Sequence, residues 1–211
     1  MLKIYGRRTS FNVQKVVWIA TELNVPFQRI DVGGKFGGLN TPEYLALNPN
    51  GKIPVIDDDG AVVWESNAIV RYIADKHGKG TWSPADPAKR AQADQWMDWY
   101  LNHLQPGFMG VFIDMYKVPP EKRNQALVKS HIQKLAEGYT FIDKHLAKRP
   151  NMLGDEITMA DIPIAASLYR TYTIGIDVPK LPNIEAWYER LKKRPAYAEH
   201  VMVDYSELRG Y

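Results

Sequence analysis

The chain contains no cysteine. This absence excludes disulfide bonds, thiolate metal sites and CxxC redox motifs, and it removes cysteine as a catalytic nucleophile. Any sulfur chemistry that this protein carries out must therefore use a thiol that belongs to its ligand.

Long apolar runs and blocks of like charge are also missing. No apolar stretch reaches the length of a membrane span, and residues 1–5 read as a strand instead of a signal peptide. The 27 basic and 24 acidic residues give a net charge of +3, with no run of one sign that could form a nucleic-acid-binding arm. We expect a cytoplasmic protein whose ligands are small molecules, with neither nucleic acid nor membrane among its partners.

The first part of the chain alternates strand and helix signals. With 211 residues, of which 45% are hydrophobic, the chain can form one large or two modest domains. Residues 1–78 predict an α/β domain in which a β-α-β unit is followed by a hairpin and a helix. The expected strands are 2–5, 27–31 and a pair within 55–63, and the expected helices are 11–23, 42–47 and one that begins at Ser66.

The second part of the chain reads as helical. Glycine and proline breaks predict a linker over residues 79–87. Beyond it, apolar residues recur at helical intervals, so residues 88–211 predict an all-α helical bundle domain with a kink at Pro106 and Gly107. Thr158 to Asp161 has the pattern of a capping box at a helix start, with Ile157 and Ile162 placed as its hydrophobic staple.

Asn50 to Ile56 and Glu65 to Ile69 together predict a site for a peptide-like anion. Pro54 has no backbone N–H, and a cis Ile53–Pro54 bond would expose the Ile53 amide and carbonyl to an extended ligand. Ser66 begins a helix, so its hydroxyl and the unpaired N–H groups of the first turn can receive a carboxylate. Glu65 beside it can take an ammonium group, so a ligand with an α-amino acid head would satisfy both residues.

Three motifs of the chain are similar to those of a known family. Asn48 to Pro54, Glu65 to Ile69 and Ile157 to Asp161 resemble, in arrangement and over essentially the whole length, the cytosolic glutathione S-transferases. This resemblance implies a thioredoxin-like N-terminal domain that binds glutathione, a helical C-terminal domain, a homodimer and a role in detoxification. It implies glutathione as co-substrate, with no further cofactor and no metal.

The turn after the first strand is where this family keeps its thiol-activating hydroxyl. The spacing of Ser10 looks like that of the serine-type branches, phi and theta among them, while Asn12 resembles part of a pattern in bacterial relatives with disulfide reductase activity. Ser10 is therefore expected to donate a hydrogen bond to the thiolate, with Asn12, Thr9 or a backbone amide as alternatives. The alternative role of Ser10 is purely structural, as the N-cap of the helix that follows.

The resemblance assigns the remaining contacts residue by residue. Ser66 is expected to hold the γ-glutamyl carboxylate and Glu65 the amino group, while Asp98 reaches the γ-glutamyl group bound by the partner subunit. The cysteinyl backbone is assigned to Ile53 beside Pro54, and the glycyl carboxylate to Lys52 or Lys35. The electrophile site is expected to have an apolar wall, although aromatic residues at helical spacing also suit a core; its candidates are Phe11, Phe108, Phe112, Met115 and Tyr116.

The resulting expectation is a glutathione transferase that conjugates the glutathione thiolate to small hydrophobic electrophiles. One alternative is a glutathione-dependent disulfide reductase or peroxidase, suggested by Ser10-Phe11-Asn12. The other is a non-catalytic ligand-binding protein with the same fold.

Overall fold

The computed structural model describes residues 1–78 and 80–210. The chain divides into two compact units, each described here by itself: unit 1 comprises residues 1–83 and 195–203, and unit 2 comprises 84–194 and 204–211. Residue 79 of the expected linker and residue 211 of the expected helical domain lie outside the described residues. None of the described helices combines the length and apolar character needed to cross a bilayer.

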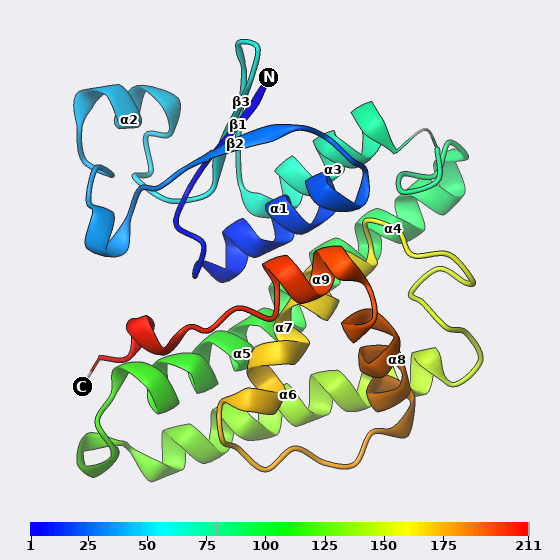
Figure 1. Ribbon diagram of the computed structural model, residues 1–211. Helices are drawn as coiled ribbons and strands as arrows, with labels where there is room; N and C mark the ends of the chain where they lie inside the picture. Colours follow the sequence, from blue (N-terminus) through cyan, green and yellow to red (C-terminus); the bar gives the residue numbers. More distant parts are fainter. Residues whose placement is uncertain (79, 211) are drawn as a thin grey trace. The chain divides into compact units, whose positions relative to one another are not determined.

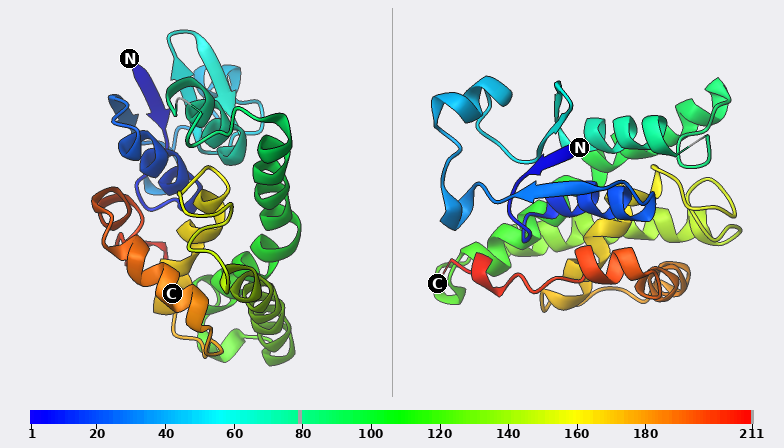
Figure 2. Two further views of the ribbon diagram at one scale, coloured as in Figure 1. Left: turned by 90° about the vertical axis from the view of Figure 1, so that its right-hand side faces the viewer. Right: turned by 45° about the horizontal axis from the view of Figure 1, so that its top comes forward.

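Unit 1 contains a four-stranded mixed sheet in the order β2-β1-β3-β4. The strands are β1 (Leu2–Tyr5), β2 (Phe27–Ile30), β3 (Val55–Asp58) and β4 (Ala61–Trp64). Strand β1 pairs in parallel with β2 and antiparallel with β3, which forms the predicted hairpin with β4; the right-hand view of Figure 2 shows β1 beside β2. The expected β-α-β unit followed by a hairpin is therefore confirmed.

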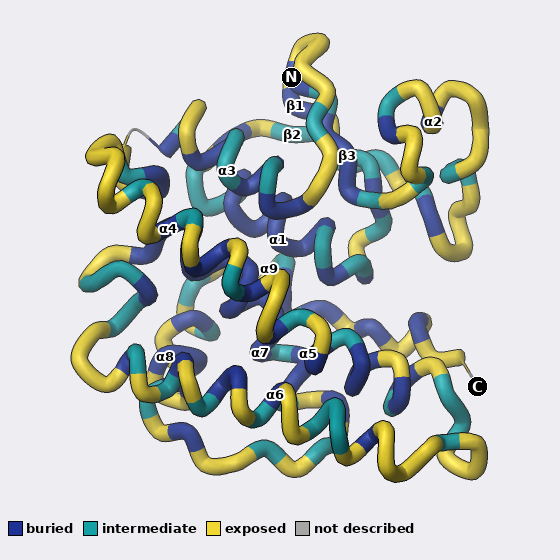
Figure 3. Tube along the Cα trace, turned by 180° about the vertical axis from the view of Figure 1, so that it is seen from behind, coloured by how far each residue is buried: buried dark blue, intermediate teal, exposed yellow. Residues whose placement is uncertain are grey.

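The core of unit 1 lies between the sheet and two packed helices, α1 (Phe11–Glu22) and α3 (Ser66–His77). Helix α1 is buried along most of its length, whereas the segment around the short helix α2 (Pro42–Leu47) is mainly exposed (Figure 3). The bounds of α1 and α2 and the start of α3 agree with the sequence expectation to within one residue, because caps and apolar periodicity are local signals.

Helix α9 (Pro195–His200) belongs to unit 1, although the sequence counts it with the helical region. It packs on α1, where the rings of Trp18 and Tyr197 meet edge to face with centroids 5.0 Å apart. The hydroxyl of Thr21 and the Nε2 atom of His200 are 2.8 Å apart. The far end of the chain thus contributes side chains to the core of unit 1.

Unit 2 is helical, with its first segment running through four successive elements. Helix α4 (Pro87–Trp99) continues into the π-helical turn η2 (Tyr100–Leu104), helix α5 (Gln105–Phe112) and a second π-helical turn η3 (Ile113–Lys117). The first π turn lies near Pro106, the residue that lacks a donor for the regular helix ladder. The π turn ends at Leu104, two residues before Pro106, and the kink at Pro106 and Gly107 stays a prediction.

The other helices of unit 2 are α6 (Gln125–Leu146), α7 (Asp161–Thr173) and α8 (Pro182–Lys192) (Figure 1). Unit 2 also contains two short 3₁₀ turns, η4 (Pro120–Lys122) and η5 (Ser206–Leu208), and unit 1 contains one, η1 (Gly34–Phe36). Helices α5 and α6 approach closely at Gly107, where an added Cβ would lie 2.9 Å from the backbone nitrogen of Leu135. The residue at this contact must therefore lack a side chain.

Candidate functional site

Ser10 stands at the end of the loop from β1 and forms the backbone N-cap of α1. Its φ and ψ of −77° and 121° are extended, its amide donates to the carbonyl of Arg7 at 3.1 Å, and its carbonyl accepts from the amide of Gln14 at 2.9 Å. The Ser10 side chain makes no capping hydrogen bond to the helix. The half-buried hydroxyl thus lies at the positive end of α1 without being used to cap it.

The segment that leads to Pro54 is held by two side chains on the carbonyl of Lys52. Tyr44 Oη donates to this oxygen at 2.8 Å, and Asn48 Nδ2 donates to it at 2.8 Å. The Oδ1 atom of buried Asn48 also accepts from the Asn50 amide at 3.0 Å. The Ile53–Pro54 bond is cis, as predicted. Polar groups within the loop therefore fix its backbone in place.

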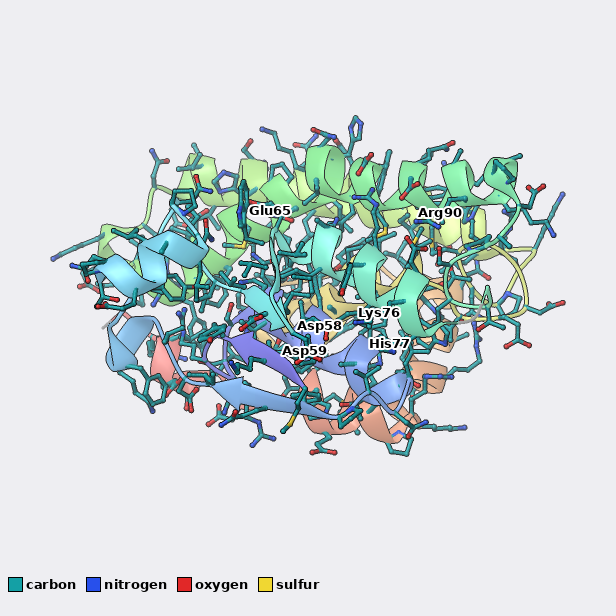
Figure 4. All side chains as sticks on the ribbon, turned by 90° about the horizontal axis from the view of Figure 1, so that it is seen from above. Asp58, Asp59, Glu65, Lys76, His77 and Arg90 are labelled. Carbon is teal, nitrogen blue, oxygen red and sulfur yellow. The ribbon has the colours of Figure 1, made fainter. Side chains whose placement is uncertain are left out.

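Helix α3 begins directly after Glu65, whose φ of 70° is rare for a residue with a side chain. Glu65 is exposed, while Ser66 is buried at the first position of the helix. Figure 4 shows Glu65 apart from the cluster that contains Asp58 and Lys76 on the same unit, so its carboxylate is not part of that surface ion pair. The start of α3 thus carries one acidic side chain and one hydroxyl at the positive end of a helix.

A buried polar cluster connects the start of α3 to α1. Ser66 Oγ donates to Asn12 Oδ1 at 3.3 Å and accepts from Lys15 Nζ at 3.4 Å, and Lys15 Nζ donates to Asn67 Oδ1 at 3.5 Å. The Lys15 ammonium also lies 4.6 Å from the centroid of the Phe11 ring. Asn12 is therefore hydrogen-bonded to Ser66, the residue that the sequence predicts to hold a carboxylate.

Burial lowers the pKa of Lys15 from 10.5 to about 7, and the negative charge of Glu65 opposes this shift. Desolvation disfavours a charged ammonium, so this lysine changes charge near neutral pH. Of the residues described here, it is the one buried lysine, and it lies next to the predicted carboxylate subsite.

Sequence reasoning missed Lys15 and Asn48. A signal for Lys15 was present, because Gln14 and Lys15 interrupt the apolar stretch from Val13 to Ala20 in a helix that is buried along most of its length. Asn48 had only the weak signal of a polar residue before a turn. Lys15 contacts residues more than fifty positions away in the chain, which spacing alone does not reveal, whereas Asn48 bonds to nearby Asn50 and Lys52.

The other candidates of unit 1 lie around this loop region. Lys35 and Lys52 have exposed side chains, and Lys35 Nζ lies 5.3 Å from the centroid of the Phe36 ring. Phe11 is buried and contacts Lys15, so it has a core role in addition to any contact with a ligand.

The remaining candidates lie in unit 2. Phe108, Phe112 and Tyr116 are buried, and Met115 is half-buried. The rings of Phe112 and Tyr116 are stacked with centroids 5.5 Å apart. Asp98 is exposed on α4, where its carbonyl accepts from the side chain of Asn102. Within the described residues, no group of three or more histidine, cysteine or acidic residues could hold a metal ion.

The fold and the arrangement of the candidate site are typical of one class of protein. A thioredoxin-like sheet, a cis-proline loop and a helix that begins with Glu65-Ser66 stand on one unit, and the second unit is helical. Two family models match this order: the glutathione S-transferase N-terminal domain over residues 1–75 and the glutathione S-transferase C-terminal domain over residues 104–195.

Individual relatives agree with these models. The glutathione S-transferase GstB of Escherichia coli is 36% identical over 98% of this chain and 100% of its own length. The crystal structure of the theta class glutathione S-transferase from Xanthomonas axonopodis pv. citri with glutathione bound is 40% identical, covers 97% of this chain and 98% of its own, and has a TM-score of 0.92. A glutathione S-transferase from Pseudomonas fluorescens is 32% identical, covers 96% of this chain and 99% of its own, and has a TM-score of 0.83. The chain belongs to the glutathione S-transferase family.

Proposed function

We propose that this glutathione S-transferase conjugates the glutathione thiolate to small hydrophobic electrophiles by nucleophilic substitution or addition. The observation that carries the proposal is the cluster at the start of α3, where Ser66 bonds to Asn12 and Lys15 and exposed Glu65 precedes it. A hydroxyl, a helix N-terminus and an acidic side chain together suit an α-amino acid head such as the γ-glutamyl group.

Ser10 is the proposed activator of the thiol. A free thiol has a pKa of about 8.5 and is mostly protonated at neutral pH, so the protein must favour the anion. The Ser10 hydroxyl donates to the sulfur, and the positive end of α1 adds about 0.3–1 kcal/mol. This role is supported by the extended N-cap geometry and by a side chain that makes no capping bond to α1.

The other parts of glutathione have proposed partners too. The backbone of Ile53 beside Pro54 pairs with the cysteinyl unit, and Lys52 or Lys35, both exposed cations, binds the glycyl carboxylate. The candidates for apolar contacts with the electrophile are Phe11 in unit 1 and, in unit 2, Phe108, Phe112, Met115 and Tyr116. Asp98 reaches the γ-glutamyl group held by the partner subunit.

Two substrates test the reaction class. Conjugation of 1-chloro-2,4-dinitrobenzene, followed by absorbance, is expected, and reduction of a mixed disulfide of glutathione is expected to be slower. Faster disulfide reduction would instead favour the reductase or peroxidase alternative. Glutathione binding without either activity would favour a non-catalytic ligand-binding protein.

Ser10→Ala tests the mechanism. We expect kcat at pH 6.5 to fall about tenfold or more. Without the Ser10 donor the pKa of the bound thiol should rise by at least one unit, or about 1.4 kcal/mol, so that less thiolate is present at this pH. The ultraviolet absorbance of the bound thiolate should disappear at this pH, and Ser206→Ala, whose hydroxyl bonds to Asp204, is the control. If the thiolate signal persisted in Ser10→Ala, then Asn12, Thr9 or a backbone amide would be the activator.

We also propose that the protein is a cytoplasmic homodimer. Glutathione keeps thiols reduced in the cytosol, so the co-substrate is available there. An aromatic surface on unit 2 suits a second copy: Phe141 is 50% exposed, and its ring stacks on Trp99 with centroids 5.2 Å apart. Two hollows border it, and their lining includes His103, Glu137 and Lys144. Cell fractionation tests the compartment, and detoxification of electrophiles follows from the proposed chemistry.

A further inference from the structure

Lys15 is a fully buried cation whose role the proposed reaction leaves open. Its Nζ atom lies 3.4 Å from Ser66 Oγ, 3.5 Å from Asn67 Oδ1 and 4.6 Å from the centroid of the Phe11 ring. These three groups carry no charge, and taking an ammonium group out of water is costly. Burial lowers the pKa of Lys15 to about 7, so a large share of the free protein holds this lysine neutral at physiological pH.

The charged groups around Lys15 come from three elements that pack on α1, namely α3, α9 and β1. Glu65, just before α3, is the anion that raises the pKa of Lys15. The other ionisable groups of these elements include several engaged elsewhere: Lys3 with Asp57, Lys76 with Asp58, Asp75 with Ser83, and His200 with Thr21 and Glu199. Tyr72 on α3 donates to Asp58, and the ring of Tyr197 on α9 packs on Trp18. The rest are Arg71 and His77 on α3 and Tyr5 on β1. A new anion near Ser66 would therefore raise the pKa of Lys15 further, in the same direction as Glu65.

A carboxylate bound at Ser66 would be such an anion. A hydrogen bond to the Ser66 hydroxyl is about 3 Å long, which places the carboxylate within about 6 Å of Lys15 Nζ. An opposite charge within that range favours the charged form of an ionisable group. Binding at the start of α3 and protonation of Lys15 must then reinforce each other, because the linkage is reciprocal.

We propose that Lys15 is the positioning residue of the γ-glutamyl subsite, holding Ser66 and Asn67 from within unit 1 and taking up a proton from solvent when the γ-glutamyl carboxylate binds. This inference rests on the proposed function, since it needs glutathione in that subsite. The proton goes to Lys15 Nζ, so the coupling is independent of the thiol and of Ser10.

Calorimetric titration with S-methylglutathione tests the coupling, because this ligand has no ionisable thiol. Titrations at pH 7.5 in two buffers of different ionisation enthalpy count the protons taken up. We expect about 0.7 proton per site if binding raises the pKa of Lys15 from about 7 to 9 or above. With these pKa values, binding should be roughly twentyfold weaker at pH 8.5 than at pH 6.5.

Two variants and a control assign the proton to Lys15. Lys15→Met has no charge to gain, so its affinity should be flat with pH and should match the weaker, high-pH affinity of the wild type. Lys15→Arg is charged at all these pH values, so it should bind without proton uptake. Lys3→Met removes an exposed lysine that pairs with Asp57, and it should behave like the wild type.

The outcomes separate this inference from the proposed function. Binding without proton uptake by the wild type, or equal uptake by the wild type and Lys15→Met, would overturn the role of Lys15 and leave the transferase proposal standing. Failure of the wild type to bind S-methylglutathione would overturn both. If Lys15→Met does not fold, the wild type and Lys15→Arg decide the question.

Discussion

At the scale of single residues, the start of α3 depends on side chains that come from α1. Ser66 uses both hydrogen-bonding capacities of its hydroxyl within the protein, as donor to Asn12 and as acceptor from Lys15. An incoming carboxylate must therefore share the hydroxyl with Asn12 or replace it. This arrangement orients the Ser66 side chain before any ligand binds, which lowers the entropy cost of binding.

Ser66→Ala should weaken glutathione binding about tenfold to a hundredfold with little loss of folding. The reason is that a hydrogen bond to a charged group contributes about 1.5–3 kcal/mol. Calorimetric titration gives the affinity, and Ser206→Ala, whose hydroxyl bonds to Asp204 in the C-terminal segment, is the matched control. An unchanged affinity in Ser66→Ala would refute the assignment of this residue.

The free energy of unfolding should depend on pH because Lys15 ionises differently in the folded and unfolded chain. Its pKa is lowered from 10.5 to about 7, so between these values the unfolded chain holds a proton that the folded chain has released. Unfolding then takes up a proton, and the contribution of Lys15 to the free energy of unfolding rises with pH in this window. Below pH 7 Lys15 is charged in the folded protein too, so the full cost of burying its charge lowers the free energy of unfolding.

Lys15→Met should therefore be more stable than the wild type at pH 6. The gap should shrink by up to about 1.4 kcal/mol per pH unit between pH 7 and pH 9. Urea unfolding of both proteins at three pH values measures the gap, with Lys3→Met as the exposed control. A gap that stayed constant with pH would show that Lys15 does not titrate in this range.

At the scale of elements, helix α7 begins with the predicted capping box, although its first regular residue is Asp161. Asp161 Oδ2 accepts from the amide and the hydroxyl of Thr158 at 2.8 and 3.1 Å, and Thr158 Oγ1 accepts from the amide of Ala160 at 3.3 Å. Asp161 Oδ1 also accepts from the amide of Met152 at 2.8 Å. Burial raises the pKa of Asp161 to about 6, an effect that these donors oppose. The capping box thus also anchors the preceding loop.

Asp161→Ala should lower the free energy of unfolding by about 3 kcal/mol or more. The substitution leaves two backbone amides and one hydroxyl without their buried acceptor, and each such group is costly to bury unpaired. Urea denaturation measures the loss, and Asp155→Ala, on an exposed residue of the same loop, is the control. A loss below 1 kcal/mol would mean that water replaces these hydrogen bonds.

At the scale of the whole molecule, the aromatic surface of unit 2 is the region that a second copy would cover. The ring of Phe141 contacts Trp99, and Trp96 lies beside both, with His145 packed on Trp96. A half-exposed aromatic cluster with hollows on either side is typical of an interaction surface.

Phe141→Glu should convert the proposed homodimer into a monomer. A charge at the centre of an apolar interface weakens association by at least about 2 kcal/mol, or roughly thirtyfold. Light scattering after size-exclusion chromatography measures the mass at several concentrations. Leu127→Glu changes an exposed residue at the other end of α6 and should leave the mass unchanged. A wild-type protein that is already monomeric would contradict the dimer proposal.

Local signals in the sequence predicted most of the elements. Helix starts at Phe11 and Ser66, the hairpin before Ser66 and the cis bond before Pro54 all follow from residues close together in the chain, and each was confirmed. The fold class followed from their order and from the family resemblance. The π turns on either side of α5 were not predicted, because they depend on how this segment packs against α6.

The sequence by itself determined the order of strands and helices, the absence of thiol chemistry in the protein and the motif Glu65-Ser66, since each depends on neighbours within a few residues. Only the tertiary structure decided that Asn12 bonds to Ser66, that Lys15 is buried beneath the same hydroxyl and that α9 packs on α1. These contacts join residues more than fifty positions apart, or nearly the whole chain length for α9. Their geometry and the shifted pKa of Lys15 come from packing and desolvation, which no local pattern encodes.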